Sequence, residues 1–231
     1  MAGERSPYGA PHRGRKARRA VAAAFAALAL AGLIAPAAAR AEPIHLVAFG
    51  DSLTAGYGLQ ASQAFPVVLE AALKAKGYDV TIENAGVSGD TSSAGLARID
   101  WSVPDGTDGV ILELGANDAL RGIDPAITEK ALDDMLARLK QRHIPVLLAG
   151  MLAPPNLGPD YAARFNPIYP KLAQKYGVPL YPFFLDGVAG GTKLNQADGM
   201  HPTPEGVKLI VQRMLPVVEA FVKDIATRKA G

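Results

Sequence analysis

Residues 44–53 read IHLVAFGDSL, an apolar run that ends at a glycine, an aspartate and a serine. The run Ile44–Phe49 shows little alternation of polar and apolar residues, which is typical of a strand covered on both faces of a parallel sheet. Further along the chain there are four more short apolar runs, Val80–Ile82, Val110–Leu114, Ile144–Ala149 and Val178–Tyr181. The sequence therefore predicts five buried strands.

Stretches with helical periodicity separate these runs. Phe65–Leu73 carries apolar residues at helical spacing, and Gly77 stands where a C-terminal cap belongs. Asp124-Pro125 and Thr203-Pro204 each combine an N-cap residue with a first-turn proline and open an amphipathic stretch. A less regular helical stretch spans about residues 160–176. Alternating strands and helices predict one α/β domain in three layers, because right-handed crossovers place helices on both faces of a parallel sheet.

The first 41 residues differ from the rest of the chain. Lys and Arg dominate residues 1–19, an apolar run covers Ala20–Ala39, and Ala39-Arg40-Ala41 fits an A-x-A cleavage site. This order is typical of a secretory signal peptide. We therefore expect residues 1–41 to be removed, with cleavage near Ala41 or at Ala39, and residues 42–231 to act as a single periplasmic or secreted domain. An uncleaved signal anchor is the alternative, because about 20 apolar residues can span a bilayer.

Charge and cysteine content exclude several classes of protein. The chain has 24 basic and 22 acidic residues, but residues 1–41 hold seven of the basic ones and one acid. The remainder has 17 basic and 21 acidic residues, a formal net charge of −4, without the clustered Lys and Arg of a nucleic-acid surface. Because the chain has no cysteine, it forms no disulfide and carries no lipoprotein attachment site.

Four polar and glycine-rich clusters follow predicted strands or precede the last helix. They are Gly50-Asp51-Ser52-Leu53, residues 84–90 (NAGVSGD), Gly115-Ala116-Asn117-Asp118 and Asp198-Gly199-Met200-His201-Pro202. In open parallel sheets ligands bind beyond the carboxyl ends of the strands, so all four clusters are expected at one edge. Taken singly, each has a simpler interpretation as a helix cap, a turn glycine or an Asx-turn residue.

The histidines point to a specific chemistry. Beyond the leader there are three, and His45 and His143 are expected at the other edge of the sheet. His201 alone lies on the edge of Ser52 and has an acid, Asp198, three positions upstream. In an Asp-x-x-His loop the carboxylate can fold back to the imidazole and fix its tautomer. We therefore predict a serine hydrolase with Ser52 as nucleophile, His201 as base and Asp198 as the residue that orients the base.

Such an enzyme also needs hydrogen-bond donors for the oxyanion of its tetrahedral intermediate. The candidates are the backbone N–H groups of Ser52 and Gly89 and the side-chain amide of Asn117. A glycine lets the substrate approach the backbone closely, and an Asn amide is a neutral donor that does not compete for the catalytic proton.

The four clusters, in this order, resemble the sequence blocks of the SGNH (GDSL) hydrolases. Gly50–Leu53 is similar to their first block, Gly89 stands in the second, Gly115–Asp118 fits their G-x-N-D block, and Asp198-x-x-His201-Pro202 fits the last. The resemblance covers roughly residues 44–225 and is closest to the bacterial thioesterase I, lysophospholipase and arylesterase subgroup.

The resemblance implies a flavodoxin-like three-layer α/β/α fold with a five-stranded parallel sheet in the order 2-1-3-4-5. It also implies the roles already assigned to the five site residues, and no metal or cofactor. The expected substrates are aryl esters, lysophospholipids and acyl thioesters. We further expect a monomer that makes transient contact with membrane lipid.

Three alternatives stay open. A carbohydrate O-acetyl esterase would use the same residues on a different substrate. A lipid carrier without catalytic activity would share the scaffold, although the complete Ser, His and Asp set argues against it. A flavodoxin-like module that binds a nucleotide or flavin is a third possibility, but neither a G-x-G-x-x-G nor a G-x-x-x-x-G-K-[ST] motif occurs.

Overall fold

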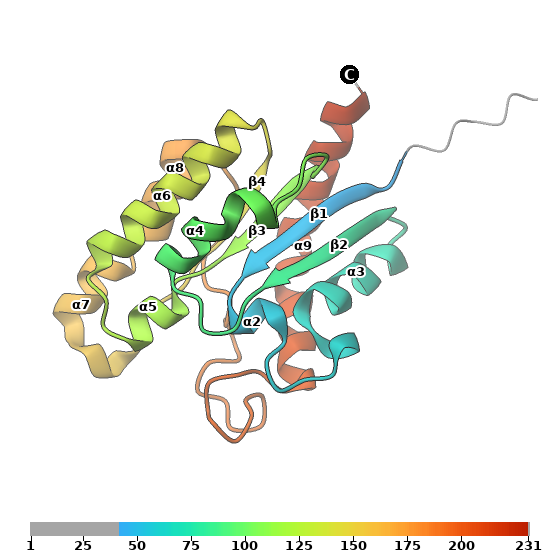
Figure 1. Cartoon of the computed structure of the whole chain (residues 1–231). Coiled ribbons are helices and arrows are strands. Elements are labelled where there is room, and N and C mark those ends of the chain that lie inside the picture. The colour runs from blue at the N-terminus through green and yellow to red at the C-terminus, as the bar shows by residue number, and fades with distance from the viewer. Residues whose placement is uncertain (1–41, 231) are drawn as a thin grey trace, which may run out of the picture. The chain divides into compact units, whose positions relative to one another are not determined.

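A computed structural model describes residues 42–230 and shows a parallel sheet between two layers of helices (Figure 1). Its strands are β1 (Ile44–Gly50), β2 (Val80–Gly86), β3 (Gly109–Glu113), β4 (Val146–Ala149) and β5 (Leu180–Tyr181). All neighbouring strands are parallel, in the order β2-β1-β3-β4-β5. The predicted fold class and strand order are thus confirmed. The expected signal peptide, residues 1–41, lies outside the described residues.

The helices divide between the two faces of the sheet. They are α2 (Ser52–Ala55), α3 (Phe65–Ala75), α4 (Ser92–Ser102), α5 (Ala116–Leu120), α6 (Pro125–Gln141), α7 (Gly158–Phe165), α8 (Ile168–Tyr176) and α9 (Pro204–Ala230), with 3-10 turns at Ala61–Gln63 and Pro155–Leu157. Helices α3 and α9 pack together on one face, while α4, α6 and α8 cover the other (Figure 1). Within residues 42–230, no helix combines the length and apolar character needed to span a bilayer.

The predicted cap of α6 is confirmed, because the side chain of Asp124 accepts a hydrogen bond from the backbone N–H of Ala126. The stretch predicted as one helix over residues 160–176 is instead two helices, α7 and α8. They are separated at Asn166-Pro167, where the Asn166 side chain turns away to accept the N–H of Ala153 at 2.9 Å.

Strand β2 is longer than the run Val80–Ile82 predicted. Its second half contains the exposed residues Glu83 and Asn84. Because β2 is the edge strand of the sheet, polar side chains there remain in contact with water, and the buried-strand pattern breaks off before the strand ends.

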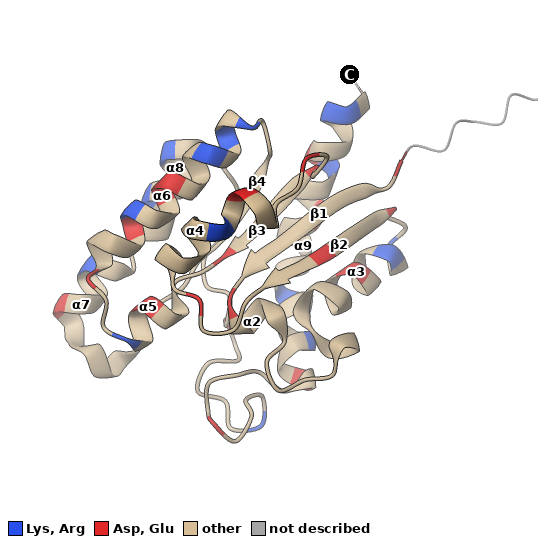
Figure 2. Cartoon of the chain, in the orientation of Figure 1, with Lys and Arg blue, Asp and Glu red and all other residues tan. Residues whose placement is uncertain are grey.

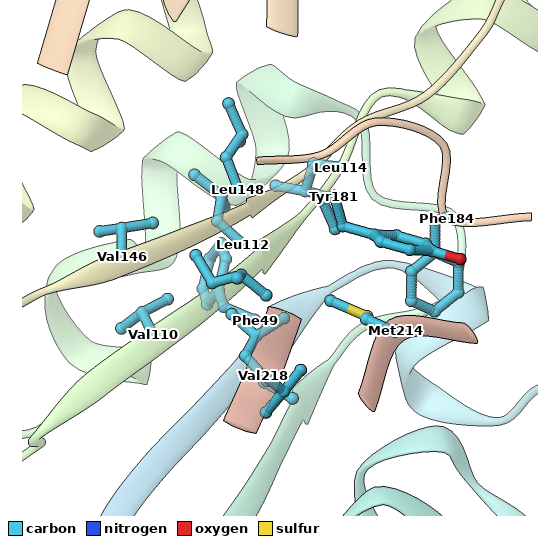
Figure 3. Packing of buried hydrophobic residues seen from close by; sticks show 14 of the residues in the cluster. Phe49, Val110, Leu112, Leu114, Val146, Leu148, Tyr181, Phe184, Met214 and Val218 are labelled. Carbon is cyan, nitrogen blue, oxygen red and sulfur yellow. The ribbon is translucent and has the colours of Figure 1, made fainter. Parts of the chain in front are cut away.

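A single apolar core fills the space on both faces of the sheet. Side chains of the central strands, including Phe49, Leu112 and Leu148, lie in the same cluster as Met214 and Val218 of α9, and all five are fully buried (Figure 3). Burying one such side chain contributes about 1.5–3 kcal/mol. The core therefore gives the carboxyl edge of the sheet a rigid base.

Candidate active site

Ser52 lies at the first turn after the central strand β1. Asp51 caps the short helix α2 by accepting the N–H of Leu53 at 2.9 Å, and Ser52 is the first residue of that helix. A Cβ atom on Gly50 would lie 2.2 Å from Thr54 Oγ1 and 2.6 Å from Glu113 Oε2, so only glycine fits between the strand and the helix. The sharp turn thus places the Ser52 hydroxyl at the carboxyl edge of the sheet.

The structure brings His201 and Asp198 to Ser52. His201 Nε2 lies 2.9 Å from Ser52 Oγ, although the two residues are 149 positions apart. His201 Nδ1 lies 2.6 Å from Asp198 Oδ2, while Asp198 Oδ1 accepts the backbone N–H groups of Met200 at 2.9 Å and His201 at 3.0 Å. The three side chains therefore form one continuous hydrogen-bonded series.

These hydrogen bonds determine that Asp198 is ionised and which ring nitrogen of His201 carries a proton. The backbone N–H of His201, its ring, and the N–H of Met200 together lower the pKa of Asp198 to about 2. An ionised carboxylate only accepts hydrogen bonds, so His201 Nδ1 carries a proton that it donates to Asp198. Nε2 of the neutral ring is then the acceptor for the Ser52 hydroxyl, as a general base requires.

Two residues that the sequence did not single out hold the imidazole in place. The ring of Tyr57, in the loop after α2, lies 4.6 Å from the ring of His201, centroid to centroid. Gln196 Nε2 donates to the carbonyl of Tyr57 at 2.8 Å and to that of Pro202 at 3.0 Å, which ties the loop after α2 to the histidine loop. These contacts join segments far apart in the sequence, so no local motif marks them.

The two further oxyanion candidates lie on the same edge. Asn117 is the second residue of α5, and its Nδ2 donates to Asp51 Oδ2 at 3.0 Å. Gly89, with φ 88°, stands in the loop after β2, where its carbonyl accepts Arg121 Nη2 at 2.8 Å. That loop is anchored beside the serine turn, since Val87 N–H donates to the Gly50 carbonyl at 3.0 Å.

A buried arginine also organises this edge. Arg98 of α4 donates to the carbonyls of Gly50 at 2.9 Å and Ala85 at 3.0 Å, and it pairs with Asp90 at 2.6 Å. One guanidinium thus joins the ends of β1 and β2 to the loop that holds Gly89. Figure 2, in which the ribbon is coloured by residue type, shows many of the other Lys, Arg, Asp and Glu residues on helices such as α6 and α8.

Two carboxyl groups are fully buried beneath the serine turn. Burial raises the pKa of Asp51 to about 6, partly offset by its hydrogen bonds from Leu53 and Asn117. Burial, and then the charge of Asp51, raise the pKa of Glu113 well above its ordinary value. Glu113 Oε2 accepts the Thr54 hydroxyl at 2.8 Å.

Ser52 and His201 open onto a cavity of about 500 Å³. Most of its lining is apolar and comes from α2, from α5 and from the loops after β4 and β5: Leu53, Ala116, Ala119, Leu120, Met151, Leu152, Ala153, Pro154, Pro155, Phe183, Leu185, Ala189 and Met200. Among the polar residues of the lining are Asn117 and Asn195. A cavity of this size, apolar apart from a few polar groups next to Ser52, fits a small molecule with an apolar chain.

The model of the GDSL-like lipase/acylhydrolase family matches residues 48–209, which include all four sequence clusters. The chain belongs to this GDSL-like family. The resemblance predicted from the four clusters is thereby confirmed.

Several relatives of this GDSL-like protein have names or structures. It is 40% identical over 168 residues to the arylesterase of Vibrio mimicus, covering 72% of this chain and 84% of the relative. It is 38% identical over 178 residues to thioesterase 1/protease 1/lysophospholipase L1 of Escherichia coli (strain K12), covering 77% and 84%. The crystal structure of AlinE4, an SGNH-hydrolase family esterase, superposes with a TM-score of 0.66 at 48% identity, covering 78% of this chain and 96% of AlinE4.

Proposed function

We propose that this protein is a serine esterase that hydrolyses acyl esters and thioesters, with Ser52, His201 and Asp198 as its catalytic triad. The observation that carries the proposal is the hydrogen-bonded series from Asp198 through His201 to Ser52, which ends at an apolar cavity. Its named relatives are an arylesterase, an esterase and a thioesterase/lysophospholipase, and the chain is an ester-hydrolysing enzyme like them.

The proposed reaction is acyl transfer in two steps. His201 Nε2 takes the proton of Ser52 as Oγ attacks the substrate carbonyl, and the oxyanion accepts hydrogen bonds from the N–H groups of Ser52 and Gly89 and from the Asn117 amide. The imidazolium, stabilised by Asp198, then protonates the leaving alcohol or thiol. Water attacks the acyl-enzyme by the same route and restores the serine.

The cavity favours substrates with an apolar acyl or aryl group, such as aryl esters, lysophospholipids and acyl thioesters. Three residues of its lining, Leu120, Leu152 and Met200, are also 55%, 43% and 46% exposed. They extend the apolar surface outward, which supports a transient contact with lipid. We further propose that a leader over residues 1–41 directs a monomeric enzyme to the periplasm or out of the cell.

Labelling with a fluorophosphonate tests the activated serine. The purified protein is treated with the probe and its intact mass is measured beside that of Ser52→Ala. We expect one adduct on the wild type and none on the variant, because only a serine with an assembled base attacks the phosphorus rapidly. A folded wild type that takes no adduct would contradict the triad and favour a lipid carrier.

Chain-length preference tests the role of the apolar cavity. We expect kcat/KM for p-nitrophenyl decanoate to exceed that for the acetate by about tenfold or more, since each buried methylene contributes about 0.8 kcal/mol. The comparison is made below the aggregation concentration of the longer ester. A preference for acetate would favour a carbohydrate O-acetyl esterase instead.

The dependence of kcat/KM on pH tests whether His201 acts as the general base. Asp198, with its pKa of about 2, stays ionised at pH 5. Its hydrogen bonds stabilise the fold fully above the ordinary carboxyl pKa, and this stability is lost only as the pH falls toward 2. We therefore expect the enzyme to remain folded from pH 8 to pH 5 while kcat/KM falls as the imidazole gains a proton. Asp51, whose pKa burial raises to about 6, titrates over the same range, so the profile is also measured with Asp51→Asn. Circular dichroism at each pH provides the control, and a flat profile in folded enzyme would argue against His201 as base.

A further inference from the structure

The two carboxylate oxygens of Asp51 accept hydrogen bonds from two different partners. Oδ1 accepts the N–H of Leu53 at 2.9 Å and so caps α2, while Oδ2 accepts Nδ2 of Asn117 at 3.0 Å. Asp51 is fully buried, and the two residues are 66 positions apart. The buried carboxylate of Asp51 is thus a specific hydrogen-bond partner of Asn117, one of the proposed oxyanion donors.

The bond determines which way the amide of Asn117 faces. A carboxylate is an acceptor only, whereas an amide has a donor NH2 group at one end and an acceptor oxygen at the other. Asp51 therefore holds the NH2 end of Asn117 toward α2 and Ser52. One N–H of that group is used by Asp51, and the second remains for a ligand in the cavity that Asn117 lines. A half-turn of the amide would present its oxygen instead, which would repel an oxyanion.

We propose that Asp51 is a positioning residue that fixes the amide of Asn117 in the orientation that donates to the oxyanion. The inference rests on the proposed function, in which Asn117 is one of the oxyanion donors. It assigns Asp51 a role in turnover that acts through Asn117 and not through the substrate, in addition to its role as a helix cap.

Asp51→Asn is the variant that separates the two roles. Asparagine caps a helix as well as aspartate does and has nearly the same shape, so α2 is expected to form. Its single amide oxygen, however, is used to cap α2 at Leu53, so its NH2 group faces Asn117 and can no longer accept from the Asn117 amide. We expect kcat to fall about 10- to 100-fold, the range that corresponds to a hydrogen bond to a charged group, with KM changed by less than about threefold.

A double-mutant cycle with Asn117→Ala provides the decisive readout. Asn117→Ala alone should lower kcat about 100- to 1,000-fold, as expected for one oxyanion donor. In that background Asp51→Asn should cost less than about twofold, because the amide it positions is gone. If Asp51→Asn lowers kcat equally in both backgrounds, Asp51 does not act through Asn117 and the inference is wrong. If Asn117→Ala alone leaves kcat unchanged while fluorophosphonate still labels Ser52, the oxyanion assignment in the proposed function is what fails.

Glu113→Gln is a matched control. Glu113 is a second fully buried carboxyl group under the same turn. Its Oε2 accepts the Thr54 hydroxyl and the backbone N–H of Asp51, and it does not bond the Asn117 amide. Glutamine keeps the length and nearly the shape of the Glu113 side chain. Any small effect of this change on kcat should multiply with that of Asn117→Ala. Should Asp51→Asn fail to fold, Asp51→Ser repeats the cycle, because serine also caps helices and is too short to reach the amide. The thermal midpoint of each variant verifies folding.

Discussion

Replacing Ser52 with alanine is expected to lower kcat for an aryl ester by about four to six orders of magnitude. The variant lacks Oγ, the proposed nucleophile, which lies 2.9 Å from His201 Nε2. In well-studied serine hydrolases the loss of the nucleophile costs about as much as the loss of the whole triad, and the residual rate comes from binding and the oxyanion donors. The measurement is steady-state hydrolysis of a p-nitrophenyl ester with purified wild type and variant.

The fold should tolerate this change, because Ser52 Oγ fills little space and its hydrogen bond runs to the imidazole at the cavity. Ser93→Ala is a matched control, since it removes the hydroxyl of an exposed serine on α4 and should leave kcat unchanged. Activity of Ser52→Ala within tenfold of the wild type, with both variants folded, would show that another group carries the reaction.

The sequence was sufficient for most of the fold because its strongest signals are local. Central strands covered on both faces leave continuous apolar runs, as in Val110–Leu114, and cap-plus-proline pairs such as Asp124-Pro125 mark helix starts. The rule that ligands bind at the carboxyl edge then placed Ser52, Asn117 and His201 together. Their meeting in the structure follows from topology and not from proximity in the chain.

What the sequence did not reveal depends on contacts between distant segments. Arg98 joins the ends of two strands by reaching Gly50, 48 positions away, and Asp51 reaches Asn117, 66 positions away. Neither partner can be identified from spacing or periodicity, because the distances are set by how the loops pack on the finished sheet. The break between α7 and α8 differs from these, because Pro167 is a local helix-breaking signal and the bond from Ala153 N–H to the Asn166 side chain only adds to it.

The assignment of Asp198 leads to the second large effect. Asp198→Asn is expected to lower kcat by about 10⁴-fold while KM changes little, as found when the orienting aspartate of other triads is replaced. Asp198 Oδ1 accepts two backbone N–H groups, so an asparagine there keeps its carbonyl oxygen toward Met200 and His201. Its NH2 group then faces the imidazole, where the carboxylate had accepted a hydrogen bond from Nδ1–H at 2.6 Å.

An NH2 group that donates to Nδ1 forces the neutral ring to carry its proton on Nε2, and a protonated Nε2 cannot accept the proton of Ser52. The loss is therefore one of tautomer rather than of fold, and labelling by fluorophosphonate should slow in proportion to kcat at an unchanged thermal midpoint. Asp186→Asn is the control, because Asp186 lies in the same connection between β5 and α9 but pairs with Arg213, away from the imidazole. If Asp198→Asn retained kcat within tenfold, the imidazole would be oriented by its contacts with Tyr57 and its own loop, and Asp198 would be only a turn residue.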